Sequence, residues 1–465
     1  MALNLHNSLS KKVEKFNPIH ADHVGMYTCG PTVYDYVHIG NWRTYILSDV
    51  VARVLAYNGY TVSYYMNITD VGHLTGDNAG DADTGEDRME KAKRREGKNA
   101  WEIALFYTAD FVDGWNKLNL KKPTAWMKAT SYIPEQIELV EKLFSNGLAY
   151  QISDGIYFDT VLYEEKGYVY GELSNLDSIK AGARVEYNPE KRNPRDFALW
   201  KFSPVNEKRD MEWQSPWGVG FPGWHIECSA MSMKYLGEQF DIHVGGEDLK
   251  STHHPNEIAQ AQGATGKHPF VAYWMHGAFL QVDGGRMGKS LGNAFNLHDI
   301  EKRGINPLSL RYFYFTAHYN SHLNFTWESL TAAENALKNL YSYIHDLGDE
   351  IGNINIEYKN KFTECINNDL NLPQALSHMW ELLKDKDISN ADKKATLFDF
   401  DTVFGFGLDT IVEEEIPLEI SKLSNERDIA RENKNWARAD ELRLEIESQG
   451  YKVKDSENGT LVTKF

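Results

Sequence analysis

Cysteine is scarce in this sequence of 465 residues, which contains only Cys29, Cys228 and Cys365. So few thiols exclude a disulfide framework and fit a reducing compartment, where cysteines serve chemistry or core packing. The sequence also lacks any apolar run near the ~18 residues that a membrane-spanning helix needs, and its first residues lack the pattern of a signal peptide. We therefore expect a soluble, cytoplasmic protein with no membrane partner.

Positive charge is also in short supply, because 67 acidic residues outnumber 49 basic ones and give a net charge of −18. This balance argues against broad nucleic-acid binding, although a cleft with basic walls can still attract a polyanion locally. The sequence shows no internal repeats and no low-complexity tail. Its 42% hydrophobic and 12% aromatic content suits a well-packed protein, and the length has room for about three domains.

The most informative stretch begins at Val24 and reads VGMYTCGPTVYDYVHIGN. Its β-branched and aromatic start predicts a strand that ends at the Gly-Pro pair. Apolar residues at helical spacing after HIGN predict a helix that stops at Asn58. Cys29 would then lie at the carboxyl end of a strand, and His38 would lie at a helix N-terminus. That edge of a parallel sheet is where ligands bind, phosphates in particular.

Strand and helix patterns alternate along much of the chain, which predicts an α/β fold with a doubly wound parallel sheet. Further strands are expected at 61–69, 240–246 and 273–280, and helices at 87–97, 99–119, 133–146 and 253–263. The loop-rich residues 120–215 are interpreted as an insertion. Helical patterns continue from about 326 into the 440s, and residues 451–465 predict a small hairpin.

A metal site is the first chemical candidate. His253 and Glu257 stand four residues apart, which places an imidazole and a carboxylate on one helix face, a common half of a zinc site. Cys29 and Cys228 could supply two thiolates and complete a four-ligand set. Spacing alone leaves another interpretation open, in which the thiols are ordinary buried residues and the His–Glu pair lies on the surface. Cys365 is expected to be a core residue.

A nucleotide site is the second candidate. A histidine at a helix start could donate to phosphate oxygens, and a glycine beside it would let a ligand approach the backbone. A Gly-Gly pair after a strand, followed by an aspartate, could seat a purine and a ribose, and a lysine in a glycine-rich loop could hold a phosphoryl group. These residues are His38, Gly40, Gly245, Gly246, Asp248 and Lys289. Taken singly, each also fits a purely structural role in a cap or a turn.

Taken together, these motifs resemble the class I aminoacyl-tRNA synthetases, whose two signatures usually read HIGH and KMSKS. Here the corresponding segments are HIGN, preceded by CGPTVYDYV, and MGKSLGN. The flanking segments YTCGPTVYD, NITDVGH, GWHIECSAM, DIHVGGEDL and HHPNEIAQ narrow the resemblance to the cysteinyl-tRNA synthetases. The C-terminal segment RDIARENKNWARADELRLEIESQGYKVKDSENGTLV is similar to the terminal module of that family. The resemblance therefore covers nearly the whole chain.

The resemblance implies roles for individual residues. The zinc ligands would be Cys29, Cys228, His253 and Glu257, with His253 preferred to its neighbour His254 because it stands four residues before Glu257. His38, Asn41 and Lys289 would contact the ATP phosphates, and further ATP contacts would come from Gly40, Gly245, Gly246, Asp248, Met287 and Ser290. Thr69 and Trp224 match residues near the cysteine pocket.

Three positions depart from the usual signatures. Asn41 replaces the second histidine of HIGH, so it can donate a hydrogen bond but cannot carry a charge. Arg286 replaces the first lysine of KMSKS, which keeps the charge and changes the geometry. Gly288 replaces a serine and removes a hydroxyl. We expect these changes to modulate the kinetics without abolishing activity.

The reaction that the resemblance implies has two steps. The carboxylate of L-cysteine attacks the α-phosphate of ATP, which is bound with Mg²⁺, and forms cysteinyl adenylate. The terminal ribose of tRNA(Cys) then takes the cysteinyl group. One Zn²⁺ per chain would recognise the substrate thiolate, because a plain pocket separates sulfur from oxygen poorly. We expect the protein to act as a monomer.

The resemblance also implies a domain organisation. A Rossmann-like catalytic domain is expected at 1–120 and 216–325, a connective α+β insertion at 121–215, a helical bundle at 326–412 and an anticodon-binding module at 413–465. In the last module Arg427, Arg431, Lys434, Trp436, Arg438 and Arg443 offer cations and one aromatic ring for RNA contacts. For any one of these arginines the alternative is an ion pair on a helix surface.

Two rival functions remain at this point. A ligase that joins cysteine to an amino sugar in mycothiol synthesis would share the zinc and ATP sites, but such ligases lack the C-terminal module. A non-catalytic, zinc-stabilised RNA-binding protein would not need His38 and Lys289 in addition to the four metal ligands.

Overall fold

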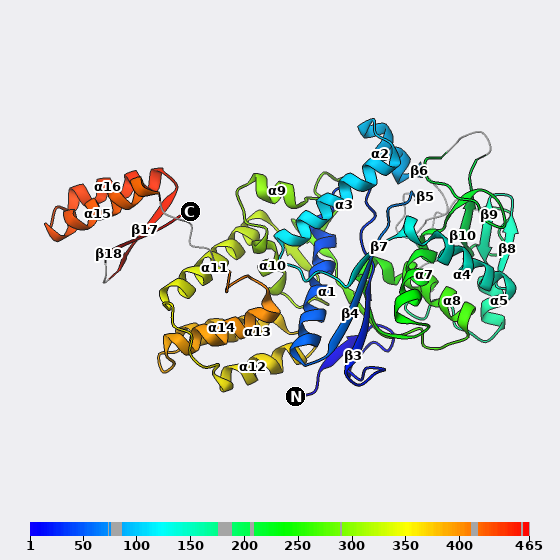
Figure 1. Ribbon diagram of the computed structural model, residues 1–465, viewed down its shortest axis with the longest axis horizontal. Helices are drawn as coiled ribbons and strands as arrows, with labels where there is room; N and C mark the ends of the chain where they lie inside the picture. The colour runs from blue at the N-terminus through cyan, green and yellow to red at the C-terminus, as the bar shows by residue number, and fades with distance from the viewer. Residues whose placement is uncertain are drawn as a thin grey trace. The chain divides into compact units, whose positions relative to one another are not determined.

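A computed structural model describes residues 1–72, 74–75, 86–174, 188–204, 209–288, 291–410, 417–456 and 459–464. The chain divides into two compact units, Met1–Leu408 and Asp409–Phe465. Figure 1 shows the elements of each unit. Within the part of the chain that is described, no helix is both long enough and apolar enough to cross a bilayer.

A five-stranded parallel sheet forms the centre of the first unit, with the strand order β13-β12-β3-β4-β7. Its strands are β3 (His23–Thr28), β4 (Thr61–Ile68), β7 (Ala125–Lys128), β12 (Phe240–Gly246) and β13 (Val271–Gly277). The middle strand, β3, and its neighbour β12 come from distant parts of the sequence and pair directly, for example Met26 with Ile242. The predicted parallel sheet is confirmed.

Helices cover both faces of this sheet. On one face α1 (Ile39–Tyr57) packs against β3, β4, β12 and β13. On the other, α7 (Trp224–Leu236) packs on β3 and β4 and against α8 (His253–Thr265), as Figure 1 shows with the sheet nearly edge-on. Every residue of α8 from His253 to Ala264 is buried. Enclosure on both faces explains the continuous apolar runs of the strands, because parallel sheets are covered on both sides.

The segment between β7 and α7 forms a lobe, whose hydrophobic core also includes Ile226 and Ala230 of α7 and Ala259 and Ala264 of α8. A four-stranded antiparallel sheet has the order β11-β10-β9-β8. Its elements are α4 (Ile133–Ser145), β8 (Ala149–Ile152), β9 (Gly155–Phe158), α5 (Thr160–Glu165), β10 (Phe197–Phe202) and β11 (Gly220–Pro222). Before it, β5 (Leu74–Thr75) and β6 (Glu86–Asp87) pair, and α2 (Arg88–Glu96) and α3 (Ala100–Lys117) follow.

The rest of the first unit begins with a small sheet of order β15-β14-β16 and continues as helices. The elements are β14 (Leu280–Val282), β15 (Gly285–Arg286), α9 (Leu297–Lys302), α10 (Leu308–Phe315), β16 (Leu323–Phe325), α11 (Trp327–Asp346), α12 (Ile356–Asn367), α13 (Leu372–Lys384) and α14 (Asn390–Phe404). A hairpin of β1 (Asn4–Asn7) and β2 (Lys12–Lys15) begins the unit.

The second unit contains α15 (Leu418–Glu432), α16 (Trp436–Ser448), β17 (Tyr451–Ser456) and β18 (Gly459–Lys464). The two strands pair antiparallel, which confirms the predicted hairpin, while residues 457–458 at its turn lie outside the described residues. Ile420, Ile446, Val453 and Val462 form a small core of their own. This module therefore has internal packing that does not depend on the first unit.

Candidate metal centre and active site

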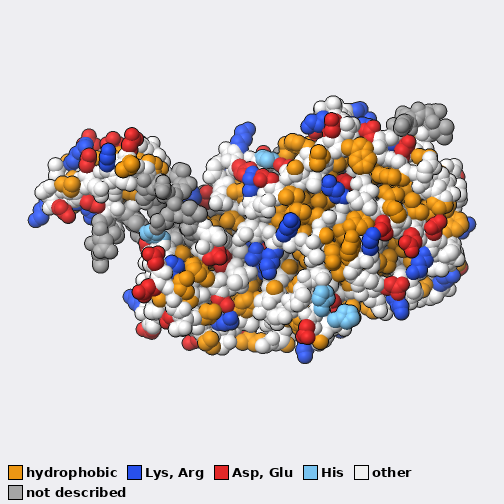
Figure 2. Space-filling model, viewed as in Figure 1, with side chains coloured by type: hydrophobic (Ala, Val, Ile, Leu, Met, Phe, Trp, Pro, Cys, Tyr) orange, Lys and Arg blue, Asp and Glu red, His pale blue; other side chains and the backbone are white. Residues whose placement is uncertain are grey.

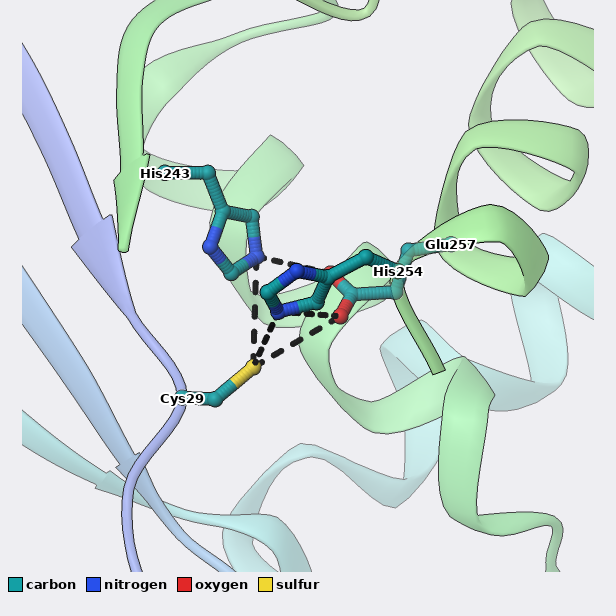
Figure 3. A group of neighbouring side chains, drawn as sticks. All are labelled: Cys29, His243, His254 and Glu257. Carbon is teal, nitrogen blue, oxygen red and sulfur yellow. Dashed lines mark hydrogen bonds and ion pairs between the residues drawn. The ribbon is translucent and has the colours of Figure 1, made fainter. Parts of the chain in front are cut away.

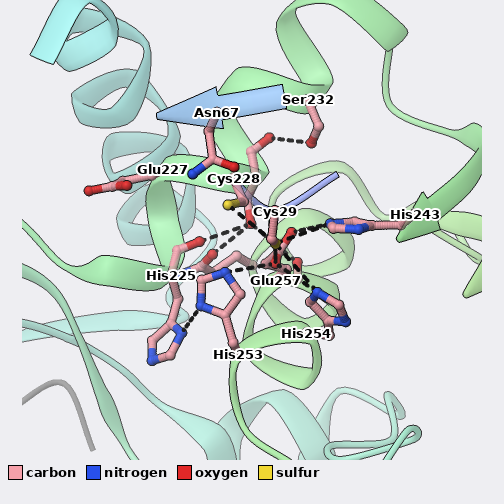
Figure 4. Close-up of polar contacts among 12 residues, drawn as sticks. Cys29, Asn67, His225, Glu227, Cys228, Ser232, His243, His253, His254 and Glu257 are labelled. Carbon is pink, nitrogen blue, oxygen red and sulfur yellow. Dashed lines mark hydrogen bonds and ion pairs between the residues drawn. The ribbon is translucent and has the colours of Figure 1, made fainter. Parts of the chain in front are cut away.

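Four side chains from three elements converge at the carboxyl edge of the central sheet. Cys29 follows β3, Cys228 lies on α7, and His253 and Glu257 lie on α8. Their ligand atoms all lie within 4.8 Å of one another, and all four residues are buried. Figure 4 shows them pointing toward a common centre. The structure thus brings together the four residues that the sequence offered as metal ligands.

The distances within this group are short. The Sγ atom of Cys29 lies 3.7 Å from Sγ of Cys228 and 3.6 Å from Oε1 of Glu257. Nε2 of His253 lies 3.0 Å from the same carboxylate oxygen. The helix begins at His253, as the sequence pattern predicts, and tolerates Pro255 because a proline in the first turn removes no helical hydrogen bond. Four-residue spacing then brings His253 and Glu257 onto one face.

A second group overlaps the first and was missed by sequence reasoning. His243 on β12 and His254 on α8 join Cys29 and Glu257, again with ligand atoms within 4.8 Å (Figure 3). Nε2 of His243 lies 2.9 Å from Oε2 of Glu257, and Nε2 of His254 lies 3.4 Å from Sγ of Cys29. The signal for His243 was present in the sequence, because a polar residue inside an apolar buried strand requires a partner.

Burial and charge set the protonation of these groups. Burial raises the pKa of Glu257, but His243 and His253 outweigh it and lower that pKa to about 2. Burial lowers the pKa of His253, but Glu257 and Cys228 outweigh it and raise the value to about 10. His254, which is buried among other histidines, has a pKa well below its ordinary value. Glu257 is therefore a carboxylate at neutral pH, and His254 is a neutral imidazole.

A surrounding layer fixes the orientation of the histidine rings. Nδ1 of His253 lies 2.9 Å from Nδ1 of His225, and the ring of Trp224 lies 4.3 Å from that of His253. Nδ1 of His254 lies 2.8 Å from Nε2 of His276. Because Nδ1 of each ring is held by a neighbouring histidine, Nε2 of His253 and of His254 faces Glu257 and the cysteine thiols.

Thr69 approaches the same region from the end of β4. Its hydroxyl donates to Oε2 of Glu227 at 2.6 Å, and Asn67 donates to Thr69 at 3.1 Å. Glu227 directly precedes Cys228 on α7. Of the two residues expected near the cysteine pocket, Trp224 packs on the candidate ligand His253, whereas Thr69 contacts the residue that precedes Cys228.

The first signature opens α1 at the same edge of the sheet. His38 caps this helix, and its Nδ1 accepts a hydrogen bond from the backbone N–H of Asn41 at 3.2 Å. A Cβ at Gly40 would lie 3.1 Å from the His38 ring and 3.4 Å from Sδ of Met287. A side chain at this position would therefore crowd the His38 ring, and Met287 lies against the first turn of α1.

Gly245 and Gly246 end β12, and neighbouring side chains leave no room for a Cβ at either position. A Cβ at Gly245 would clash with the ring of His254, and one at Gly246 would clash with the carboxylate of Asp248. These glycines let the backbone of β12 lie close to both side chains. Lys289 and Ser290 fall outside the described residues.

The two substituted positions of the second signature both bond to the side chain of Asn293. Arg286 is in β15, and its carbonyl accepts from the Asn293 side chain at 3.0 Å. The side-chain oxygen of Asn293 accepts from the backbone N–H of Gly288 at 2.8 Å. Asn293, the last residue of MGKSLGN, thus joins the two ends of that segment.

Comparison with known proteins identifies the family and the fold. The model of the tRNA synthetases class I (C) catalytic domain matches residues 15–335. Solved structures with a similar fold include methionyl-tRNA synthetase of Mycobacterium tuberculosis in complex with methionyl-adenylate, with a TM-score of 0.55 and 14% identity over 83% of this chain and 90% of that one. Another is the LeuRS–tRNA complex of Agrobacterium radiobacter, with a TM-score of 0.58 and 12% identity over 86% and 85% of the two chains. The fold and the family model together define a class I tRNA synthetase.

Relatives that match this chain over nearly their whole length identify the family within class I. A cysteine–tRNA ligase of Burkholderia lata is 48% identical over 99% of this chain and 96% of its own length. The cysteine–tRNA ligase of Treponema denticola is 42% identical, with 100% of each chain covered. The chain therefore belongs to the cysteine–tRNA ligase family of class I synthetases, and it is an enzyme.

Proposed function

We propose that this enzyme attaches L-cysteine to tRNA(Cys) through a cysteinyl-adenylate intermediate, and that Zn²⁺ selects the substrate through its thiolate. The observation that carries the proposal is the convergence of Cys29, Cys228, His253 and Glu257 beside Trp224 at the sheet edge that also holds the first signature. Family membership supports the attachment of cysteine to tRNA. The four candidate metal ligands support the selection of cysteine through its thiolate.

The residues present fit zinc. Two thiols, one imidazole and one carboxylate form a four-member set that includes soft donors, which zinc accepts and the hard cations Mg²⁺ and Ca²⁺ do not prefer. All four are buried, and His225 holds the second nitrogen of His253. A bound zinc ion favours the thiolate form of a thiol and so distinguishes cysteine from serine at neutral pH.

Trp224 and Thr69 would complete the cysteine pocket. The Trp224 ring packs on that of His253, and Thr69 is fixed through Glu227. Apolar and hydroxyl groups beside the metal centre would orient the amino acid so that its carboxylate points toward the first signature. Such orientation is how a site converts binding into a reactive geometry.

The chain's own residues would position the phosphates of ATP. Because Nδ1 of His38 accepts from the N–H of Asn41, the neutral ring carries its proton on Nε2 and can donate it to a phosphate oxygen. The N-terminus of α1 adds backbone donors and a favourable dipole. Lys289 and Ser290 would contact the phosphates from the second signature together with Mg²⁺, and catalysis would rest on positioning and charge stabilisation.

The nucleoside would lie across the ends of β3 and β12. Gly40 and Met287 already lie together, and Gly245, Gly246 and Asp248 stand at the neighbouring strand end. Ligands of open parallel sheets bind at this carboxyl edge. We assign the purine and ribose to these residues and the phosphates to His38, Asn41 and Lys289.

The second unit would contact tRNA(Cys). Trp436, the first residue of α16, is 60% exposed and can stack on a base. Arg427 is instead buried and donates to Asp455 and Thr460, so its contacts are internal. Figure 2 shows side chains of both signs mixed over this unit, which fits selective contacts rather than a broad cationic surface.

A pair of measurements tests the proposal. The protein with zinc should catalyse cysteine-dependent ATP–pyrophosphate exchange and charge tRNA(Cys), and calorimetry should show far tighter binding of cysteine than of serine. Removal of zinc by a chelator should abolish that preference. Equal affinities of the zinc-loaded protein for cysteine and serine would refute thiolate selection, and exchange without charging of tRNA would point to the amino-sugar ligases.

A further inference from the structure

Arg43 on α1 is a buried arginine that holds two turns of the chain together. Its side chain is only 4% exposed. The guanidinium donates to four backbone carbonyls: Nη1 to Ala278 at 2.8 Å and Phe279 at 3.0 Å, and Nη2 to Ser321 at 2.6 Å and His318 at 3.2 Å. The two nitrogens therefore face different turns, one after β13 and one after α10.

These two turns lead into strands that pair with each other. Residues 278–279 precede β14, residues 318–321 precede β16, and the strands pair in parallel from Leu280 with Leu323 onward. Antiparallel pairing of β14 with β15 then leads directly into the MGKSLGN segment. Arg43 thus fixes the residues just before β14 and β16, the two strands that begin the small sheet next to the second signature.

The four hydrogen-bond partners of Arg43 are neutral backbone carbonyls, so the shape of the guanidinium matters more here than its charge. Within the described part of the chain, the guanidinium has no carboxylate at ion-pair distance, whereas Arg53 and Arg311 both contact Asp49. Burial lowers the pKa of Arg43 to about 10, so it stays charged at neutral pH. A planar fork can reach carbonyls on two sides, and an ammonium, with its donors at a single point, cannot.

The other end of the segment is also fixed to α1. The N–H of Ile39 donates to the carbonyl of Phe295 at 2.8 Å, and the backbones of His38 and Asn296 pair in an isolated antiparallel β-bridge. The residues on both sides of the second signature are therefore held to α1, Phe295 and Asn296 by backbone bonds and β14 and β15 through Arg43.

We infer that Arg43 is a positioning residue for adenylate formation, because it sets the placement of β14 and β15, and so of the start of the second signature at Met287, relative to His38. The inference rests on the proposed roles of His38 and Lys289 at the phosphates. Displacement of the segment by about 1 Å would cost roughly 100-fold in rate, because the reacting groups must be held in line.

Arg43→Lys and Arg43→Gln test this role in cysteine-dependent pyrophosphate exchange. The expected result is a fall in kcat of about 10- to 100-fold with little change in the KM for cysteine. Glutamine removes the buried charge and keeps two donors, so it provides a folded variant if lysine does not. Arg53→Lys is the matched control, since Arg53 is also buried on α1 and also donates to backbone carbonyls, at Thr402 and Asn119. It should lower the melting temperature and leave kcat intact.

A double mutant separates this inference from the proposed function. Once Lys289→Ala has removed the group to be positioned, Arg43→Lys should lower kcat far less than it does in the parent. Full additivity, an unchanged kcat in both Arg43 variants, or an equal loss in Arg53→Lys would overturn the inference. A Lys289→Ala enzyme with parental exchange would instead overturn the proposed function of the second signature.

Discussion

The carboxylate of Glu257 joins two imidazoles that come from different elements. Its Oε1 lies 3.0 Å from Nε2 of His253, one turn away on α8, and its Oε2 lies 2.9 Å from Nε2 of His243 on β12. One buried anion is therefore shared by two groups that each have metal-ligand geometry. Substitutions on either side of Glu257 can tell which group holds the cation.

Cys228→Ser should remove the metal. Loss of one thiolate from a four-ligand set should leave less than one zinc per chain and lower cysteine-dependent exchange by at least about 100-fold, beyond the 10- to 100-fold effect of an outer partner. Elemental analysis and exchange kinetics measure both. Cys365→Ser is the control, because that buried thiol lies on α12. Full zinc in Cys228→Ser would assign the cation to the group with His243 and His254.

His253→Asn and His243→Asn should differ in kind. The first removes a proposed ligand and should abolish stoichiometric zinc binding. The second should keep zinc and weaken its affinity by roughly 10- to 100-fold, because Glu257 loses the partner that orients its second oxygen. Competition with a chelator gives the affinities. A metal-free His243→Asn protein alongside a zinc-loaded His253→Asn protein would reverse the assignment.

Asp49→Asn should change the pH dependence of stability. Burial raises the pKa of Asp49, but Arg311 and Arg53 more than offset it and hold that pKa below its ordinary value. A lowered carboxyl pKa contributes stability above the unfolded pKa of about 3.9, and that contribution is lost as the pH falls through the folded value.

At neutral pH the Asp49→Asn protein should be less stable by roughly 3–5 kcal/mol, because two buried guanidinium groups lose their anion. The difference should shrink as the pH falls below about 4. Urea unfolding across this range measures it. A gap that stays constant with pH would show that the Asp49 charge contributes nothing.

Trp436→Ala should separate tRNA charging from activation. Loss of an exposed ring should lower kcat/KM for tRNA(Cys) about 10-fold, which is within the range for one base–aromatic stack. Pyrophosphate exchange and the melting temperature should not change, because the ring lies on the surface of the second unit. Trp436→Phe should recover most of the loss, and equal charging by the alanine variant and the parent would exclude a stacking contact.

Local features of the site follow from the sequence. The four-residue spacing of His253 and Glu257 predicts that they share a helix face, as they do on α8. The predicted helix at 99–119 is present as α3, where the side chains of Asn99 and Glu102 form a capping box. These features depend on neighbours a few residues apart, where periodicity and capping chemistry dominate.

The convergence of Cys29 with Cys228 could not be obtained in that way. It depends on the packing of α7 against β3 and on the pairing of β3 with β12, both of which involve distant parts of the chain. Spacing alone therefore favoured ordinary buried thiols, and only the family resemblance favoured a shared metal site. His243 was missed because its partner, Glu257, belongs to another element.

The strand order of the central sheet also bears on synthesis. Cys29 leaves the ribosome long before α7 and α8, and β3 has to wait for β12 before it gains one of its two neighbours in the sheet. Until Glu257 has been translated, a nascent chain carries this thiol without the groups that later enclose it. The four candidate ligands can therefore come together only late in translation, and the timing is set by chain topology.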